Sequence, residues 1–196
     1  LVNPSNLCFL HRPLAETTIE YRQLIAYVWL ENYNGLVLTY TRGKYSSAHR
    51  TLLLGRRSVG FGGHVLQRDA VNLFGAADAG LEQAAMREIG EELGGQLPES
   101  IRIAGLIWDD SSFEGQKHIG VVMRGALPAS FVMPSRAGEM SIKQLQLLTK
   151  AQLWDTYHAM EFWSQLLVRE FAPESKPAVV STIVPDRRPR RIGHIA

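Results

Sequence analysis

Three glutamates and one arginine lie close together in the string MREIGEELGG, at positions 86–95. If this string is helical, Glu88 lies three residues before Glu91 and four before Glu92, so all three carboxylates share one patch of the helix surface. Like charges at these spacings repel, and Arg87 can relieve part of that repulsion by pairing with Glu91. A divalent cation relieves more, because Mg²⁺ prefers oxygen ligands and is held by carboxylates, water and phosphate oxygens. The string therefore favours a cation site over a solvated helix face.

The residues around these acids carry the pattern of an amphipathic helix. An apolar side chain recurs at every fourth position, at Leu81, Ala85, Ile89 and Leu93. The pair Gly94-Gly95 then favours a helix end. We expect a helix over 81–93 that buries this stripe and presents the acids beside it.

A glycine-rich corner precedes the helix. The segment 51–65 predicts a short apolar strand that runs into the string GFGGHV at 60–65. Because glycine has no Cβ, the pair Gly62-Gly63 lets the backbone come close to a metal ion or a phosphate.

The other segments predict the elements that position these residues. Apolar, β-branched and aromatic residues predict strands at 23–31, 36–42, 101–110 and 118–127. The string NYNG joins the first two strands as a hairpin. Segment 66–80 has no clean period and predicts a loop, whereas 141–171 predicts two helices broken near Lys150. This order predicts an α/β domain with a mixed, mostly non-parallel sheet.

Composition limits the class of protein. The chain has 196 residues, of which 45% are hydrophobic and 20% charged, as expected for one globular domain at 1–172 with a Pro/Arg-rich C-terminal tail at 173–196. No run of 18 or more apolar residues predicts a membrane span. The single cysteine, Cys8, excludes an internal disulfide and fits a cytoplasmic protein.

The net charge of +2 is too small to indicate a polyanionic partner. The tail holds the basic string PDRRPRR, but it is short and contains no aromatic residues, so we do not expect nucleic acid as a partner. A homodimer stays open.

The string REIGEELG resembles the core of the Nudix box, the signature of the Nudix hydrolases. That box has the pattern G-x5-E-x7-R-E-U-x-E-E-x-G-U, in which U is aliphatic. The resemblance implies an α/β/α sandwich, bound Mg²⁺ or Mn²⁺, and hydrolysis of a phosphoanhydride bond in a nucleoside diphosphate linked to another group. The string EFWS at 161–164 is similar to the C-terminal helix of a Nudix branch in which an extended loop follows GGH.

The resemblance also implies roles for individual residues. The metal ligands would be Glu88, Glu91, Glu92 and the backbone carbonyl of Gly62. Arg87 would pair with a glutamate and hold the cluster in shape, and Gly63 would be the first glycine of the box.

The general base is left open among Glu91, Glu92 and Glu139. Many Nudix proteins recruit a further acid from a later loop, and Glu139 is the best placed by order along the chain, with Glu114 as its competitor.

Substrate contacts are predicted less specifically. His64 could face a phosphate or serve as a structural hydrogen-bonding residue. Arg56 and Arg57 could bind phosphate through their planar guanidinium groups or be solvated loop residues. Three aromatic residues could stack on a base, although their spacing singles out none of them: Tyr45, Trp108 and Phe113.

The chain departs from the box pattern in the loop before the helix. Between Gly63 and Arg87 lie 23 residues, where the pattern has 13, so the loop carries roughly ten more. The position of the first box glutamate holds Asp69 when counted forward from Gly63, and Ala79 when counted backward from Arg87. The acids that could fill this position are Asp69, Asp78 and Glu82.

Two other functions compete with hydrolysis. A Nudix-fold module that binds a nucleotide without turnover is favoured by the missing box glutamate and the longer loop, but not by the intact Arg-Glu-Glu-Glu set. The isomerase branch of the family needs a catalytic cysteine, and Cys8 lies in the N-terminal segment.

Overall fold

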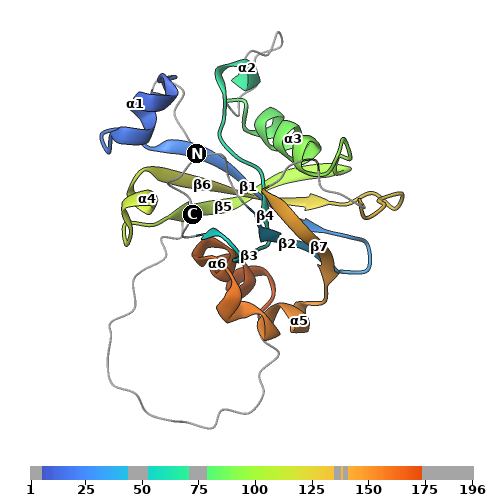
Figure 1. Cartoon of the computed structure of the whole chain (residues 1–196). Coiled ribbons are helices and arrows are strands. Elements are labelled where there is room, and N and C mark those ends of the chain that lie inside the picture. The colour runs from blue at the N-terminus through green and yellow to red at the C-terminus, as the bar shows by residue number, and fades with distance from the viewer. Residues whose placement is uncertain (1–5, 44–52, 71–78, 135–137, 139–140, 174–196) are drawn as a thin grey trace, which may run out of the picture.

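A seven-stranded mixed sheet forms the centre of the protein (Figure 1). The computed structural model describes residues 6–43, 53–70, 79–134, 138 and 141–173. Its strands are β1 (Gln23–Glu31), β2 (Val37–Arg42), β3 (Arg57–Ser58), β4 (Gly60–Phe61), β5 (Ser100–Trp108), β6 (His118–Ala126) and β7 (Ile142–Leu148). β1 and β6 run parallel and all other paired strands are antiparallel, which confirms the predicted sheet.

Helices cover both faces of the sheet. They are α1 (Arg12–Thr17), α2 (Gln67–Ala70), α3 (Leu81–Glu92), α4 (Phe113–Gln116), α5 (Lys150–Asp155) and α6 (Phe162–Phe171). In Figure 1, α2 and α3 lie above the sheet and α5 and α6 lie below it. The architecture is therefore the predicted α/β/α sandwich. None of the helices in the described part of the chain combines the length and apolar character that crossing a bilayer requires.

Strand β1 lies between two apolar cores. Ala26, Val28 and Leu30 pack in the core beneath α3, whereas Tyr27 and Trp29 pack in the core of α5 and α6. Successive side chains of a strand point to opposite faces, so a nearly continuous apolar strand is what a sheet covered on both faces requires.

The glycine-rich segment fills a split between β1 and β2. These two strands pair only at Glu31 and Val37, beside their turn. Farther along, β4 pairs with β1, and β3 pairs with the edge of β2 that faces β1. Residues 57–61 therefore lie in the middle of the sheet, and the glycine corner that follows them emerges there.

The structure corrects the prediction of two helices over 141–171. Residues 142–148 form strand β7, which pairs with β2, and a helix begins only at Lys150 after its N-cap residue Thr149. An irregularity shifts the pairing between Thr39 and Thr41, and Gln144 has a φ of 50°. This irregularity interrupts the alternation of the strand, so Ile142 and Leu145 mimic helical spacing in the sequence.

The predicted loop at 66–80 contains a short helix, α2. Helices α1 and α4 are not predicted by the sequence either. Each of these helices has only four to six residues, too few to show a helical period.

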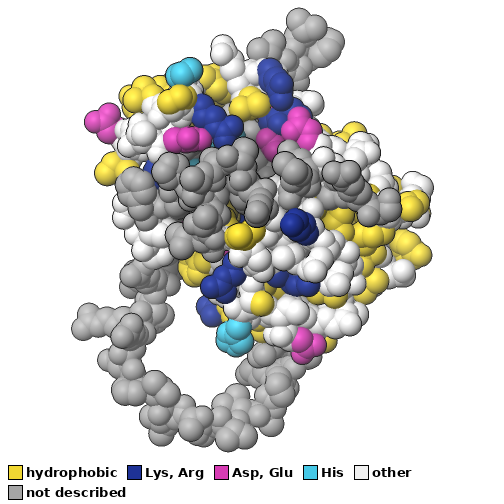
Figure 2. Space-filling model, in the orientation of Figure 1, with side chains coloured by type: hydrophobic (Ala, Val, Ile, Leu, Met, Phe, Trp, Pro, Cys, Tyr) yellow, Lys and Arg dark blue, Asp and Glu magenta, His cyan; other side chains and the backbone are white. Residues whose placement is uncertain are grey.

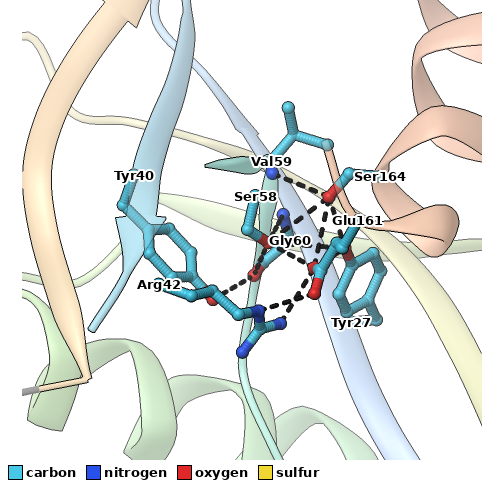
Figure 3. Close-up of polar contacts among 8 residues, drawn as sticks. All are labelled: Tyr27, Tyr40, Arg42, Ser58, Val59, Gly60, Glu161 and Ser164. Carbon is cyan, nitrogen blue, oxygen red and sulfur yellow. Dashed lines mark hydrogen bonds and ion pairs between the residues drawn. The ribbon is translucent and has the colours of Figure 1, made fainter. Parts of the chain in front are cut away.

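A buried polar cluster ties α6 to the sheet (Figure 3). At its centre is Glu161, the N-cap residue of α6, which is only 7% exposed. Arg42 donates two hydrogen bonds to its carboxylate, from Nε to Oε2 at 2.6 Å and from Nη2 to Oε1 at 2.9 Å. Ser58 Oγ and Tyr27 Oη also donate to Oε1, at 2.6 and 2.7 Å. The string EFWS thus supplies the buried acid at the start of α6.

The same cluster fixes the segment that leads into the glycine corner. Ser164 Oγ accepts the Val59 N–H at 3.0 Å, and Tyr40 Oη donates to the Gly60 carbonyl at 3.1 Å. A Cβ on Gly60 would lie 1.9 Å from Cζ of Tyr27, so this position requires glycine. These contacts fix the position of residues 58–60, which end two residues before Gly62.

Charge and burial oppose each other at Glu161. Burial alone would raise the pKa of its carboxyl, but the Arg42 charge and the hydrogen bonds from Arg42, Ser58 and Tyr27 outweigh burial and lower it. Burial and the nearby Glu161 charge raise the pKa of Tyr27 well above its ordinary value. Glu161 is therefore ionised in the folded protein at neutral pH.

Replacing Glu161 with Gln should destabilise the protein by about 3 kcal/mol at neutral pH, because Arg42 would lose its buried partner. Since folding lowers the pKa of Glu161, its contribution is complete above the ordinary value of 4.5 and is lost as the pH falls through the folded pKa. The stability gap between wild type and Glu161→Gln should thus narrow in acid, measured by urea unfolding across pH. The exposed Glu99→Gln is the control, and a gap that stays constant in acid would contradict the assignment.

Candidate active site

Helix α3 presents its acids to the glycine corner. The stripe of Leu81, Ala85, Ile89 and Leu93 is buried in the core beneath α3, as predicted. The helix begins after Gly80, which has a φ of 82°, and is followed by Gly94 with a φ of 66°. Both values lie in the left-handed region, which glycine enters without a steric penalty.

The carboxylate of Glu88 lies directly against Gly63. A Cβ on Gly63 would sit 2.6 Å from Cδ of Glu88, so any other residue would push that carboxylate away. Ala26 of β1 donates its N–H to the Gly63 carbonyl at 2.9 Å, which fixes this part of the corner to the sheet.

Glu92 contacts the other glycine of the corner. Its carboxylate Oε2 accepts the N–H of Gly62 at 3.0 Å, and the residue is only 6% exposed. Gly62 has a φ of 120°, and a Cβ there would lie 2.3 Å from the carbonyl oxygen of Ala26. Two of the three box glutamates thus meet the Gly62-Gly63 backbone, one at each residue.

Arg87 joins the helix to the chain that follows the corner. Its Nε and Nη2 donate to the two carboxylate oxygens of Asp69, each at 2.9 Å, and Nη2 also donates to the His64 carbonyl at 3.1 Å. The hydrogen bonds from Arg87 lower the pKa of Asp69 despite its burial. The same hydrogen bonds, which Asp69 accepts from Arg87, raise the pKa of Arg87, so this pair stays ionised at neutral pH.

Asp69, one of the acids considered for the missing box glutamate, thus meets Arg87. It is the residue found by counting forward from Gly63, and it lies in α2, where its Oδ2 also accepts the Leu66 N–H at 2.8 Å. Glu82 is exposed in the first turn of α3, and Asp78 lies outside the described residues. The additional loop residues therefore enter after the acid position of the box.

Arg87 also faces two of the predicted metal ligands. Its Nη1 lies 2.7 Å from Glu88 Oε1 and 3.6 Å from Glu91 Oε2. Across the residues that the structure describes, no three His, Cys, Asp or Glu side chains are gathered closely enough to hold a metal ion. Glu88 and Glu91 face the Arg87 guanidinium, and Glu88 and Glu92 contact the backbone of the corner.

A later loop passes the end of α3. Gly138 donates its N–H to the Glu92 carbonyl at 3.1 Å, and a Cβ on Gly138 would lie 1.9 Å from the carbonyl oxygen of Glu91. Glu139 itself lies outside the described residues, as does Tyr45. Gly138 nevertheless brings the chain to the C-terminal turn of α3 immediately before Glu139.

The predicted substrate residues lie in two places. The ring of His64 packs edge-on against His118, with 5.6 Å between ring centroids. Arg57 donates to Thr39 Oγ1 at 2.8 Å, and Arg56 donates to the His158 carbonyl at 3.4 Å, so both arginines contact residues other than the box. The structure does not bring either arginine together with the acids of α3.

Acidic and basic side chains gather on the upper part of the molecule in Figure 2, where Figure 1 has α1, α2 and α3. Besides Arg87, Arg68 of α2 lies 3.8 Å from Glu91. The site therefore combines several carboxylates, two arginines and a glycine backbone that accepts close contacts. The hard oxygen atoms of these carboxylates suit a divalent cation, which also takes phosphate oxygens as ligands.

Solved structures with the same architecture carry the Nudix name. Tm1382, provisionally classed as a Nudix hydrolase, matches with a TM-score of 0.64 and 25% sequence identity, over 84% of this chain and 78% of that protein. The chain has the fold of the Nudix hydrolases. The helix at 81–92 carries the string that resembles the Nudix box, and it faces the corner Gly62-Gly63.

Other Nudix structures share the fold at lower identity. The Nudix domain of Shewanella oneidensis NrtR, crystallised with ADP-ribose, has a TM-score of 0.53 and 15% identity over 81% of this chain and 94% of that domain. The MutT protein of Methanosarcina mazei Go1 has a TM-score of 0.52 and 19% identity over 80% of this chain and 97% of that protein. No protein-family model and no curated protein sequence matches the chain.

Alanine at the two corner glycines should have different effects. Gly62→Ala should cost about 2 kcal/mol or more, because it combines a strained φ with a clash against the sheet backbone. Gly63→Ala should cost less than about 1 kcal/mol, because the Glu88 carboxylate can turn aside. Urea unfolding measures both, with Gly105→Ala in β5 as the control, since a Cβ there meets nothing within 4 Å. Equal losses at Gly62 and Gly63 would contradict this description of the corner.

Proposed function

We propose that the protein is a Mg²⁺- or Mn²⁺-dependent Nudix hydrolase that cleaves a phosphoanhydride bond in a nucleoside diphosphate-linked or related nucleotide. The observation that best supports this proposal is the contact between the acids of α3 and the glycine corner. Asp69 holds Arg87, and two carboxylates of α3 contact Gly62 and Gly63. A solvated helix face would not need this combination.

The residues at the corner fit a divalent cation. Glu88, Glu91, Glu92 and the Gly62 carbonyl would hold it, since all supply oxygen atoms and no described residue donates a hydrogen bond to that carbonyl. A cation bound there would neutralise the diphosphate oxygens and lower the pKa of a bound water. The Arg87 guanidinium, which already contacts Glu88 and Glu91, keeps their carboxylates within reach of the corner.

The chain's own residues supply the proton transfer and the binding of substrate. Glu91 has the most exposed side chain of the three box glutamates, at 45%, so its carboxylate can reach a water molecule beside the substrate. Glu139 competes for this role, because Gly138 brings its loop to the end of α3. We propose Glu91 or Glu139 as the general base before Glu92, whose carboxylate is engaged by Gly62.

A small-molecule nucleotide is the proposed substrate. The NrtR Nudix domain was crystallised with ADP-ribose, which contains a diphosphate between two ribosyl groups. At the corner, Gly63 and His64 would lie beside such a diphosphate. The cytoplasmic location and a homodimer stay predictions.

A nucleotide-binding module without turnover is the second candidate. It is favoured by the contacts of Arg87 with Glu88 and Glu91, which occupy carboxylates that catalysis needs. Release of phosphate-containing products separates the two candidates. Nucleoside diphosphate sugars, dinucleoside polyphosphates and nucleoside triphosphates would be incubated with the protein and Mg²⁺ or Mn²⁺. Metal-dependent binding without cleavage at high protein concentration would overturn the hydrolase.

Glu92→Gln should abolish metal-dependent cleavage while the protein stays folded, because the amide oxygen can still accept the Gly62 N–H but lacks the charge for the cation. Divalent metal should raise the melting temperature of the wild type and not that of Glu92→Gln, since only the folded state would bind it. Glu99→Gln, an exposed glutamate in the segment before β5, serves as the control. Full activity in Glu92→Gln, or a wild-type melting temperature indifferent to millimolar Mn²⁺, would contradict the metal assignment.

A further inference from the structure

An exposed tryptophan at the end of β5 is held in one orientation. Trp108 is 61% exposed, although burying a side chain of this size is normally favourable. Its indole Nε1 donates to Asp110 Oδ2 at 2.7 Å, and Arg22 Nη2 donates to Asp110 Oδ1 at 2.6 Å. The Arg22 guanidinium lies over the indole, 4.0 Å from the ring centroid. The three side chains form a closed set that fixes the ring, with the guanidinium over one of its faces.

This set, which we call the Trp108 platform (Trp108, Arg22 and Asp110), lies on the same face of the sheet as the box helix. Ile107 packs in the core of α5 and α6, so the adjacent Trp108 points to the opposite face. On β1, Leu24 and Ala26 pack towards α3, and Arg22 continues that alternation. The contact between Arg22 and Trp108 agrees with both assignments.

The platform also lies within reach of the corner. Ala26 pairs with Gly63, and Arg22 precedes Ala26 by four residues, which is about 13 Å along an extended strand. The ribose and phosphate linkage of a nucleotide spans a distance of this order. A ligand with its diphosphate at Gly63 can therefore extend along the start of β1 to Trp108.

The chemistry of the platform suits a nucleobase. Every base has a flat π surface that stacks on an aromatic side chain regardless of sequence, and arginine adds a cation–π contribution. Beside Trp108, the same face of β5 carries the exposed apolar side chains of Leu106 and Ile103, at 43% and 38%. Because the indole is held in advance by Asp110 and Arg22, little side-chain freedom is lost when a base stacks on it.

We propose that the Trp108 platform binds the nucleobase of a nucleoside diphosphate whose phosphates lie at the Gly62-Gly63 corner. This inference rests on the proposed function, because the corner must bind the diphosphate. It adds a stacking residue that favours nucleosides in general and does not by itself distinguish one base from another.

The test compares two non-hydrolysable ligands by calorimetry in the presence of Mg²⁺. These are α,β-methylene-ADP and methylenediphosphonate, which share the diphosphate mimic and differ by the nucleoside. Trp108→Ala should raise the dissociation constant of α,β-methylene-ADP about tenfold and leave that of methylenediphosphonate unchanged. Trp108→Phe should retain most of the affinity, because a smaller aromatic ring still stacks. Tyr33→Ala is the control, since Tyr33 is another exposed aromatic residue, at 78%, in the turn between β1 and β2.

Each other result decides against the platform. An unchanged affinity of Trp108→Ala for α,β-methylene-ADP overturns it, as does a wild type that binds both ligands equally well. In both cases the proposed hydrolase stands, because the corner still binds a diphosphate. A wild type that binds neither ligand overturns the proposed function together with the platform. A wild-type dimer that Trp108→Ala converts to a monomer in sedimentation would assign this surface to self-association instead.

Discussion

The ion pair between Arg87 and Asp69 determines how the rest of the site is arranged. Both nitrogens that Arg87 presents to Asp69 donate at 2.9 Å, so the guanidinium has a fixed plane and a fixed position. From that position it also contacts the His64 carbonyl and Glu88. One side chain thus links α2, α3 and the residue after the corner, and its charge offsets the repulsion among the box glutamates.

The corner is held from a second direction by the Glu161 cluster. Tyr27, Ser58 and Arg42 converge on the Glu161 carboxylate, and Ser164 binds the backbone of Val59. These contacts fix the segment that fills the split between β1 and β2. The Gly62-Gly63 backbone that follows is therefore placed by the sheet on one side and by α3 on the other, which suits a site that must bind a ligand without rearranging.

Much of this arrangement could be predicted from the sequence. The box helix, the glycine corner and four strands carry strong local patterns, and the family resemblance implied the sandwich that the structure has. Strand β7 could not be predicted, because an irregularity between Lys143 and Gln146 disturbs the alternation that marks a strand. The roles of Asp69 and Glu161 depend on residues 18 and 119 positions away in the chain, and no local pattern reports such partners.

The proposed function depends most on Asp69 and Arg87 acting as one unit that holds the glutamates of α3 in place. A double-mutant cycle tests it most directly, with kcat/KM for metal-dependent nucleotide cleavage measured in the wild type, Asp69→Asn, Arg87→Gln and the double variant. Residues that act as a unit give non-additive losses. We predict that each single variant loses most of the activity and that the double variant loses no more than Arg87→Gln. Full activity in Asp69→Asn, or losses that add in the double variant, would contradict the claim.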